Sequence, residues 1–256
     1  MKLFSMVTKD QYLNQIILQC TKGTNENSTE YNIANTVLPR KIRIWAGTDI
    51  NDVYWAGSYA KGTNVIGSSD LDLFVSLKDS SQTLRDYYVD LFSYFNREYS
   101  TRRQNVSIGI DTQGYHFDIT PGRLQNPNND HSIFVRKKNT WTKTNIFHHI
   151  NLIKNSDRIS EIKLMKIWRN RHKIDFPSFY LELSVIRALE DNFSTSITEN
   201  FITVLTYFRD KFVQSQILDP ANTNNVISDD LSYLEKKIIS NTAQNSLNGK
   251  WSDAIW

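Results

Sequence analysis

The stretch Val53-Tyr-Trp-Ala-Gly-Ser-Tyr-Ala-Lys-Gly-Thr-Asn-Val-Ile-Gly-Ser-Ser-Asp-Leu-Asp-Leu-Phe-Val75 decides how this chain folds. It reads as an apolar strand, a Gly-Ser turn, a polar connection and a second strand that carries two aspartates two residues apart. Side chains i and i+2 of a strand share a face. Asp70 and Asp72 are therefore expected to point the same way, roughly 7 Å apart, while the apolar residues between them face the core.

Two carboxylates that converge on one place suggest a metal site. Hard oxygen ligands suit Mg²⁺, and two such ions about 3.5–4 Å apart commonly support nucleotidyl transfer. Two ions need a third carboxylate, and Asp118 lies between apolar Phe117 and Ile119, so it is expected to point away from the core. Burying an unpaired acid there is costly, which favours a metal or a basic partner. The sequence therefore predicts a site for two Mg²⁺ ions, with Mn²⁺ as the alternative, at Asp70, Asp72 and Asp118.

The spacing of these residues resembles the DNA polymerase β-type nucleotidyltransferase superfamily: Gly57-Ser58, then Asp70-x-Asp72, then Asp118. The resemblance implies that Gly57 and Ser58 contact the NTP triphosphate and that the three aspartates are the catalytic, metal-binding acids. Asp-x-Asp alone is commonly a solvated strand end and Gly-Ser alone a turn, so the assignment depends on the whole set. A P-loop is excluded because the order Gly-x-x-x-x-Gly-Lys-Ser/Thr is absent.

The second half resembles oligoadenylate synthetases and bacterial cGAS/DncV-like nucleotidyltransferases (CD-NTases). Ile162-Lys-Leu-Met-Lys-Ile-Trp168 is similar to a helix of these enzymes that sends a lysine to the triphosphate, and by register that lysine is Lys166. Pro177-Ser-Phe-Tyr-Leu-Glu182 resembles the next helix start, which implies that Ser178 approaches phosphate at an anion-favouring helix N-terminus. Asp219-Pro-Ala-Asn-Thr-Asn-Asn-Val226 resembles a loop of the same enzymes. The resemblance extends from about residue 8 to the end.

Lys61 departs from the family pattern, because related enzymes commonly have arginine there. A lysine neutralises phosphate as a point charge but lacks the bidentate geometry of arginine. We therefore add Lys61 to the expected nucleotide-binding residues. The chain is also short for a CD-NTase, so insertions that shape acceptor and product choice are expected to be missing.

The hydrophobic pattern changes near residue 140, and strands are expected before this point. We predict a helix over 8–20, a helix over 31–45 kinked or divided at Pro39, and a helix that starts at Ser80 or Ser81. Strands are predicted at 53–58, 70–77, 104–110, 114–119 and 132–136.

Helices are expected after residue 140, at 159–171, from Pro177, at 198–213 and at 229–247. The prediction is an α+β fold. A mixed-sheet nucleotidyltransferase lobe (1–140), whose N-terminal helix can pack on the other lobe, precedes an α-helical, oligoadenylate-synthetase-like lobe (141–256). The NTP is expected in the cleft between them.

Composition fits a cytoplasmic enzyme without a membrane segment. Cys20 is the single cysteine and cannot form an internal disulfide. No run of about 18 apolar residues exists, and the N-terminus lacks the apolar core of a signal peptide. The net charge of +3 permits polyphosphate binding without requiring nucleic acid.

We therefore expect a metal-dependent nucleotidyltransferase that moves an NMP from an NTP to an acceptor hydroxyl and releases pyrophosphate. The resemblance favours a cyclic or short linear oligonucleotide second messenger, as in bacterial antiviral defence signalling, with ATP as donor because related enzymes most often use it. Two alternatives stay open: an enzyme, including a toxin, that adds nucleotides to RNA or tRNA ends, and a catalytically inactive nucleotide-binding module. Basic clusters scattered between acidic residues favour the second messenger over RNA.

Overall fold

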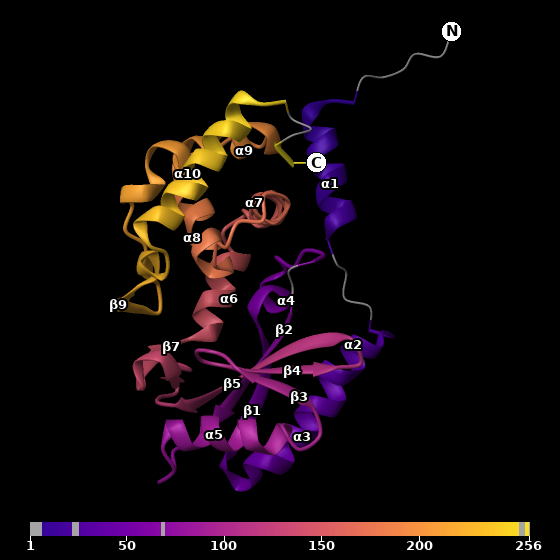
Figure 1. Cartoon of the computed structure of the whole chain (residues 1–256), viewed down its shortest axis with the longest axis vertical. Coiled ribbons are helices and arrows are strands. Elements are labelled where there is room, and N and C mark those ends of the chain that lie inside the picture. The colour runs from indigo at the N-terminus through magenta and orange to yellow at the C-terminus, as the bar shows by residue number, and fades with distance from the viewer. Residues whose placement is uncertain (1–6, 22–25, 68–69, 251–253, 256) are drawn as a thin grey trace. The chain divides into compact units, whose positions relative to one another are not determined.

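The computed structural model describes residues 7–21, 26–67, 70–250 and 254–255. The chain forms two compact units (Figure 1). The sheet unit comprises Gly23–Gly62 and Ser69–Asn151, and the helical unit comprises Met1–Lys22, Thr63–Ser68 and Leu152–Trp256.

The described residues of the sheet unit form a seven-stranded mixed sheet. Its main order is β1-β2-β5-β4-β3; β6 pairs with β5 and β7 with β6. β2 and β5 run parallel, whereas every other neighbouring pair is antiparallel. The strands are β1 (Ile50–Ala56), β2 (Leu71–Leu77), β3 (Ser100–Arg103), β4 (Ile108–Thr112), β5 (Tyr115–Leu124), β6 (His131–Val135) and β7 (Thr140–Thr144).

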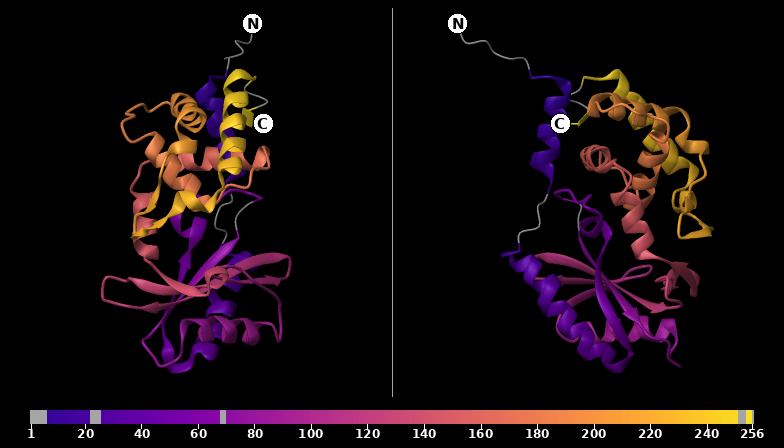
Figure 2. Two further views of the ribbon diagram at one scale, coloured as in Figure 1. Left: turned by 60° about the vertical axis from the view of Figure 1, so that its left-hand side comes forward. Right: turned by 180° about the vertical axis from the view of Figure 1, so that it is seen from behind.

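Alternation along β2 and β5 gives the sheet one apolar face. Leu71, Leu73 and Val75 are buried on that face with Phe117 and Ile119 of β5. Two helices, α3 (Leu38–Ala46) and α5 (Leu84–Phe95), contribute Leu38, Ile42, Tyr88 and Leu91 to the same core. They lie on the same side of the sheet in all views (Figures 1 and 2). The opposite face is therefore left for polar side chains, among them those at positions 70 and 72.

The helical segment before the sheet is interrupted close to Pro39, where a kink or a division was predicted. It runs as α2 (Thr29–Asn32), a π-helical turn (Ile33–Val37) and α3, with Pro39 near the α3 N-terminus. A π turn hydrogen-bonds over five residues instead of four, and Leu38 N accordingly donates to Ile33 O. Because proline has no N–H to donate, it is tolerated at the start of the new α-helical segment.

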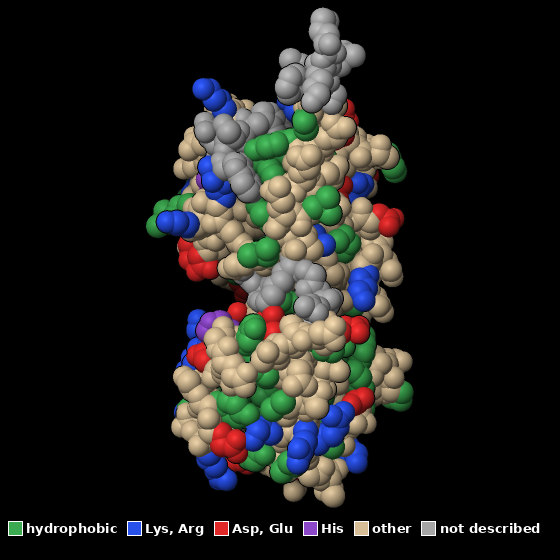
Figure 3. Space-filling view, turned by 90° about the vertical axis from the view of Figure 1, so that its right-hand side faces the viewer, with side chains coloured by type: hydrophobic (Ala, Val, Ile, Leu, Met, Phe, Trp, Pro, Cys, Tyr) green, Lys and Arg blue, Asp and Glu red, His purple; other side chains and the backbone are tan. Residues whose placement is uncertain are grey.

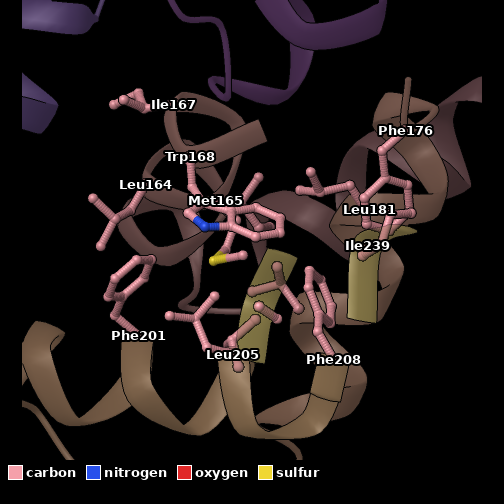
Figure 4. Packing of buried hydrophobic residues seen from close by; sticks show 14 of the residues in the cluster. Leu164, Met165, Ile167, Trp168, Phe176, Leu181, Phe201, Leu205, Phe208 and Ile239 are labelled. Atoms are coloured by element: carbon pink, nitrogen blue, oxygen red, sulfur yellow. The ribbon is translucent and has the colours of Figure 1, made fainter. Parts of the chain in front are cut away.

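The helical unit packs around Trp168, which is fully buried. Its rings and those of Phe176, Phe208 and Phe212 form a continuous aromatic cluster with centroids 5–6 Å apart. Figure 4 labels Trp168, Phe176 and Phe208 of this cluster. None of the helices in the described part of the chain is long and apolar enough to cross a membrane. The helices are α1 (Lys9–Cys20), α7 (Ile159–Arg171), α8 (Ser178–Ala188), α9 (Ile197–Asp210) and α10 (Tyr233–Asn248), and α6 (Ile146–Lys154) contains the boundary between the units.

The α+β class is confirmed, and several boundaries differ from the prediction. The helix expected from Ser80 or Ser81 begins at Leu84, because Thr83 Oγ1 accepts a hydrogen bond from Asp86 N and caps it. The helix expected from residue 229 begins at Tyr233, where Ser232 forms a capping box. The third predicted strand interval, 104–110, is shifted to β4.

Helix α6 and four strands are among the elements that were not predicted. β3 has the sequence Ser-Thr-Arg-Arg and β7 has Thr-Trp-Thr-Lys-Thr, so neither shows an apolar alternation. The segment expected as a loop after Leu218 is a hairpin of β8 (Leu218–Asp219) and β9 (Asn222–Val226). Pairing with neighbouring strands, rather than the pattern of each segment alone, makes these strands form.

Candidate active site

One row of residues crosses five strands on the polar face of the sheet. The strand registers pair Arg102 with Gly109, Gly109 with Asp118, and Asp118 with Asp72. Asp72 in turn pairs with Ala56 at the end of β1. Residues in register on neighbouring strands point to the same face. The parallel pairing of β2 and β5 therefore sets two of the predicted acids, Asp72 and Asp118, directly side by side.

Gly57 follows Ala56 and lies against Asp72. Its φ is +58°, a left-handed conformation that favours glycine. A Cβ built on Gly57 would be 1.7 Å from Asp72 Oδ2 and 2.4 Å from Asp72 Cγ. The Asp72 carboxylate thus occupies the space that any other residue at position 57 would need. Ser58 is half-buried in the short helix α4 (Gly57–Lys61), which ends at the buried Lys61.

Asp118 is half-buried, and its Oδ1 accepts a 2.7 Å hydrogen bond from Gln104 Nε2. Burial raises the pKa of the Asp118 carboxyl, and the nearby charge of Asp70 raises it further. Arg102 and the Gln104 hydrogen bond lower the same pKa in part. A cation at this position would offset the cost of ionising Asp118.

Asp70, just before β2, is exposed and lies close to a cation of the chain itself. Arg102 Nη2 is 3.9 Å from Asp70 Oδ2, and Arg102 Nη1 is 2.6 Å from Asp111 Oδ1. His116 Nδ1 contacts the same Asp111 oxygen. Among the residues that the structure describes, no three or more His, Cys, Asp or Glu side chains converge closely enough to hold a metal ion by themselves. Asp72 and Asp118 are the adjacent pair of oxygen donors, and a charge contact connects Asp70 to Arg102.

The predicted phosphate-binding Lys166 lies in a buried polar cluster of the helical unit. Lys166 Nζ donates to Glu182 Oε1 at 2.7 Å and to Thr63 Oγ1 at 2.9 Å. Thr63 Oγ1 donates to the same Glu182 oxygen at 2.8 Å. Lys166 and Glu182 are each 1% exposed, so the ion pair is desolvated. The cluster also holds the chain two residues after α4 ends.

Ser178 and Asp219, both within resemblance motifs, make local contacts. Ser178 is the first residue of α8, and its Oγ accepts a 2.9 Å hydrogen bond from Arg169 Nη1. Asp219 is buried and accepts hydrogen bonds from Ala221 N at 2.9 Å and Asn225 Nδ2 at 3.2 Å. These two bonds stabilise the turn of the β8–β9 hairpin.

We call the polar face of the sheet that carries Asp70, Asp72 and Asp118 the acid face. Three further residues there were not predicted: Arg102, Gly109 and Gln104. Arg102, next to Arg103, belongs to one of the basic clusters scattered between acidic residues. A glycine between two isoleucines of a strand is a signal that another group approaches the backbone closely, and Gly109 fits this signal. A Cβ at Gly109 would be 2.7–2.9 Å from atoms of the Arg102 side chain.

The chain is similar to a known domain family and to several solved structures. Residues 40–120 match the family model of the nucleotidyltransferase domain. CdnC of E. coli MS115-1, solved with ATP, is 18% identical, with a TM-score of 0.77 over 94% of this chain and 91% of that one. CdnG of Bradyrhizobium diazoefficiens, a CD-NTase solved with GTP, is 15% identical, with a TM-score of 0.77 over 94% and 90%.

CdnE of Elizabethkingia meningoseptica, described as a cyclic dinucleotide synthase and solved with GTP and Apcpp, is 14% identical, with a TM-score of 0.72 over 95% of this chain and 100% of that one. None of the curated proteins matches this sequence. The chain therefore has a nucleotidyltransferase domain within the fold of the bacterial CD-NTases. This confirms the expected superfamily and the expected class of enzyme, a nucleotidyltransferase.

Replacing Gly57 with alanine tests the contact with Asp72. The new Cβ must displace the carboxylate, and a misplacement of about 1 Å at a reacting centre can cost on the order of 100-fold in rate. We expect Gly57→Ala to lower pyrophosphate release from NTP by about this factor. Gly47→Ala is the matched control, because Gly47 has a φ of +54° but no atom within 4 Å of its Cβ position. Equal activity of the two variants would contradict the role of this contact.

Lys166→Met tests the buried ion pair, because it leaves the Glu182 charge without its main partner. Breaking a buried pair on one side typically costs about 3–5 kcal/mol of stability. Urea unfolding followed by far-UV circular dichroism should show a loss of this size. The double variant Lys166→Met/Glu182→Leu should recover most of it, because neither charge is then buried alone. If Lys166→Met were as stable as the wild type, the buried ion pair between Lys166 and Glu182 would not stabilise the fold.

Proposed function

We propose that this protein transfers an NMP from an NTP to an acceptor hydroxyl, with release of pyrophosphate, and that its product is a cyclic or short linear oligonucleotide. The observation that carries the proposal is the adjacent pair Asp72 and Asp118 beside the Gly57 turn. The turn lies against the Asp72 carboxylate, Asp118 is the register partner of Asp72, and Ser58 follows Gly57 in the chain. This combination suits a metal-bound triphosphate better than either part alone.

Each acid has a distinct role in the proposal. Mg²⁺ or Mn²⁺, two ions in all, would neutralise the triphosphate and lower the pKa of the acceptor hydroxyl when bound. Asp70 and Asp72 hold the donor triphosphate through this charge, and Asp118 orients the acceptor for in-line attack on the α-phosphorus. Ser58 and Gly57 contact the β- and γ-phosphates, with Lys61 adding positive charge. Lys166 and Ser178 are proposed as further phosphate contacts, as the resemblance implies.

Lys166 would have to exchange one of its present partners to contact a phosphate. Its Nζ carries three N–H donors, and the hydrogen bonds to Glu182 and Thr63 use two of them. Ser178 keeps its own O–H as a donor, because the bond from Arg169 uses only an acceptor position of the hydroxyl. A phosphate oxygen could therefore accept a hydrogen bond from Ser178 directly, and from Lys166 after such an exchange.

The second-messenger product is favoured over addition to RNA. The fold extends over the full length of the CdnE chain described as a cyclic dinucleotide synthase. RNA-end enzymes need an extended basic surface, whereas two cations of α3 are paired here: Lys41 with Glu98 and Arg43 with Asp52. On the face of the sheet unit seen in Figure 3, basic side chains are interspersed with acidic and apolar ones. RNA or tRNA addition is the second candidate.

Isosteric substitutions of the paired acids test the reaction. Asp72→Asn and Asp118→Asn each remove a charge without changing shape, and we expect pyrophosphate release to fall at least about 1,000-fold. Asp79→Asn is the matched control, because Asp79 lies just beyond the other end of β2 with its side chain 88% exposed. Labelled NTPs, singly and in pairs and with or without RNA, should give products resolved by chromatography and mass spectrometry. Wild-type turnover by either acid variant would overturn the site, and NTP binding without any product would favour an inactive binding module.

We further propose ATP as the preferred donor. A purine offers a larger ring for stacking than a pyrimidine does, and CdnC was solved with ATP. When all four NTPs are present at equal concentration, ATP should be consumed first. Faster consumption of UTP or CTP would contradict this choice, while faster consumption of GTP would leave the purine preference intact.

A further inference from the structure

Arg102 lies on the acid face, although it belongs to none of the expected site residues. Its guanidinium is 2.6 Å from Asp111 Oδ1 and 3.9 Å from Asp70 Oδ2. The positive charge also acts on Asp118, two strands away in the same row. Three acidic side chains on this face are thus under the influence of one arginine.

The sheet is shaped to let Arg102 reach the acids. Gly109 separates Arg102 from Asp118 in the strand register. The side chain of Arg102 lies across Gly109 so closely that a Cβ there would be 2.7 Å from Arg102 Cγ and 2.8 Å from Arg102 Nε. Asp111, two residues along β4, holds the guanidinium at one end, and His116 contacts Asp111 from the next strand. Contacts among residues of β3, β4 and β5 therefore fix the position of the Arg102 side chain.

We propose that Arg102 is a positioning residue that serves as the resident counter-cation of the acid face and competes with the divalent metal for Asp70. While Arg102 is near Asp70, the carboxylates of Asp70, Asp72 and Asp118 do not converge. With a divalent cation bound, Asp70 would turn toward the other two acids, while Arg102 would keep its contact with Asp111. This role rests on the proposed function, because it concerns the same three acids.

The competition has two consequences. Removing the positive charge of Arg102 raises the affinity of the acids for a divalent cation, because a cation near the acids repels the incoming ion. The same removal destabilises the metal-free protein, because the acids then repel each other without a counter-charge. If Arg102 instead bound the metal-loaded substrate directly, removing its charge would lower the affinity for the divalent cation.

The test measures Mn²⁺ binding to the whole chain without nucleotide, by electron paramagnetic resonance of the free ion. Arg102→Gln should bind Mn²⁺ about threefold to tenfold more tightly than the wild type, and Arg102→Lys, which keeps the charge, should stay near the wild-type affinity. Arg103→Gln is the matched control, because Arg103 is the next residue of β3 and its guanidinium lies 4.1 Å from the Phe92 ring. It removes the same charge from the opposite face and should leave the affinity unchanged.

A second readout follows thermal unfolding. In EDTA, Arg102→Gln should unfold at a lower temperature than the wild type, and Mn²⁺ should narrow the difference. Affinity of Arg102→Gln equal to or below that of the wild type, or an equal increase in Arg103→Gln, would overturn the role of Arg102.

Asp72→Asn separates this failure from failure of the proposed function. Wild-type Mn²⁺ binding that is lost in Asp72→Asn but not strengthened by Arg102→Gln contradicts the role of Arg102 alone. Absence of Mn²⁺ binding by the wild type and by Arg102→Gln contradicts the role of Arg102, whereas absence of pyrophosphate release from NTP contradicts the proposed function.

Discussion

The contact between the Asp72 carboxylate and the backbone of Gly57 constrains the rest of the catalytic unit. The carboxylate occupies the position that a Cβ at residue 57 would take, and the turn has a positive φ. The end of β1, the start of α4 and the position of the acid therefore depend on one another. Register with Ala56 on one side and with Asp118 on the other extends the same constraint across the sheet.

Bringing acids together at one place on a sheet is unfavourable without compensation. Burial and the charge of Asp70 both raise the pKa of Asp118, and each reflects a cost of keeping it ionised. Gln104 and Arg102 offset part of that cost in the chain itself. The apolar core on the other face holds the strands in register while these charges repel. The fold thus keeps an acidic face that is strained electrostatically and suited to a cation.

Short-range rules predicted the centre of the candidate site. The i, i+2 spacing of Asp70 and Asp72 and the Gly57 turn could be read from adjacent residues, because a strand alternates its faces locally. The parallel pairing that sets Asp118 beside Asp72 was not readable in this way. It depends on which strands become neighbours, and the position of Arg102 depends on β3, whose polar sequence gives no strand pattern. The partners of Lys166 were hidden for the same reason, because Thr63 is 103 residues away in sequence.

A crystal structure with Mn²⁺ and a non-hydrolysable ATP analogue tests the central claim most directly. The anomalous signal of manganese identifies the ion without assumptions about the surrounding side chains. The account predicts manganese between the carboxylates of Asp72 and Asp118, with the triphosphate against the Gly57-Ser58 turn. Nucleotide bound elsewhere, or manganese bound away from these two carboxylates, would contradict it.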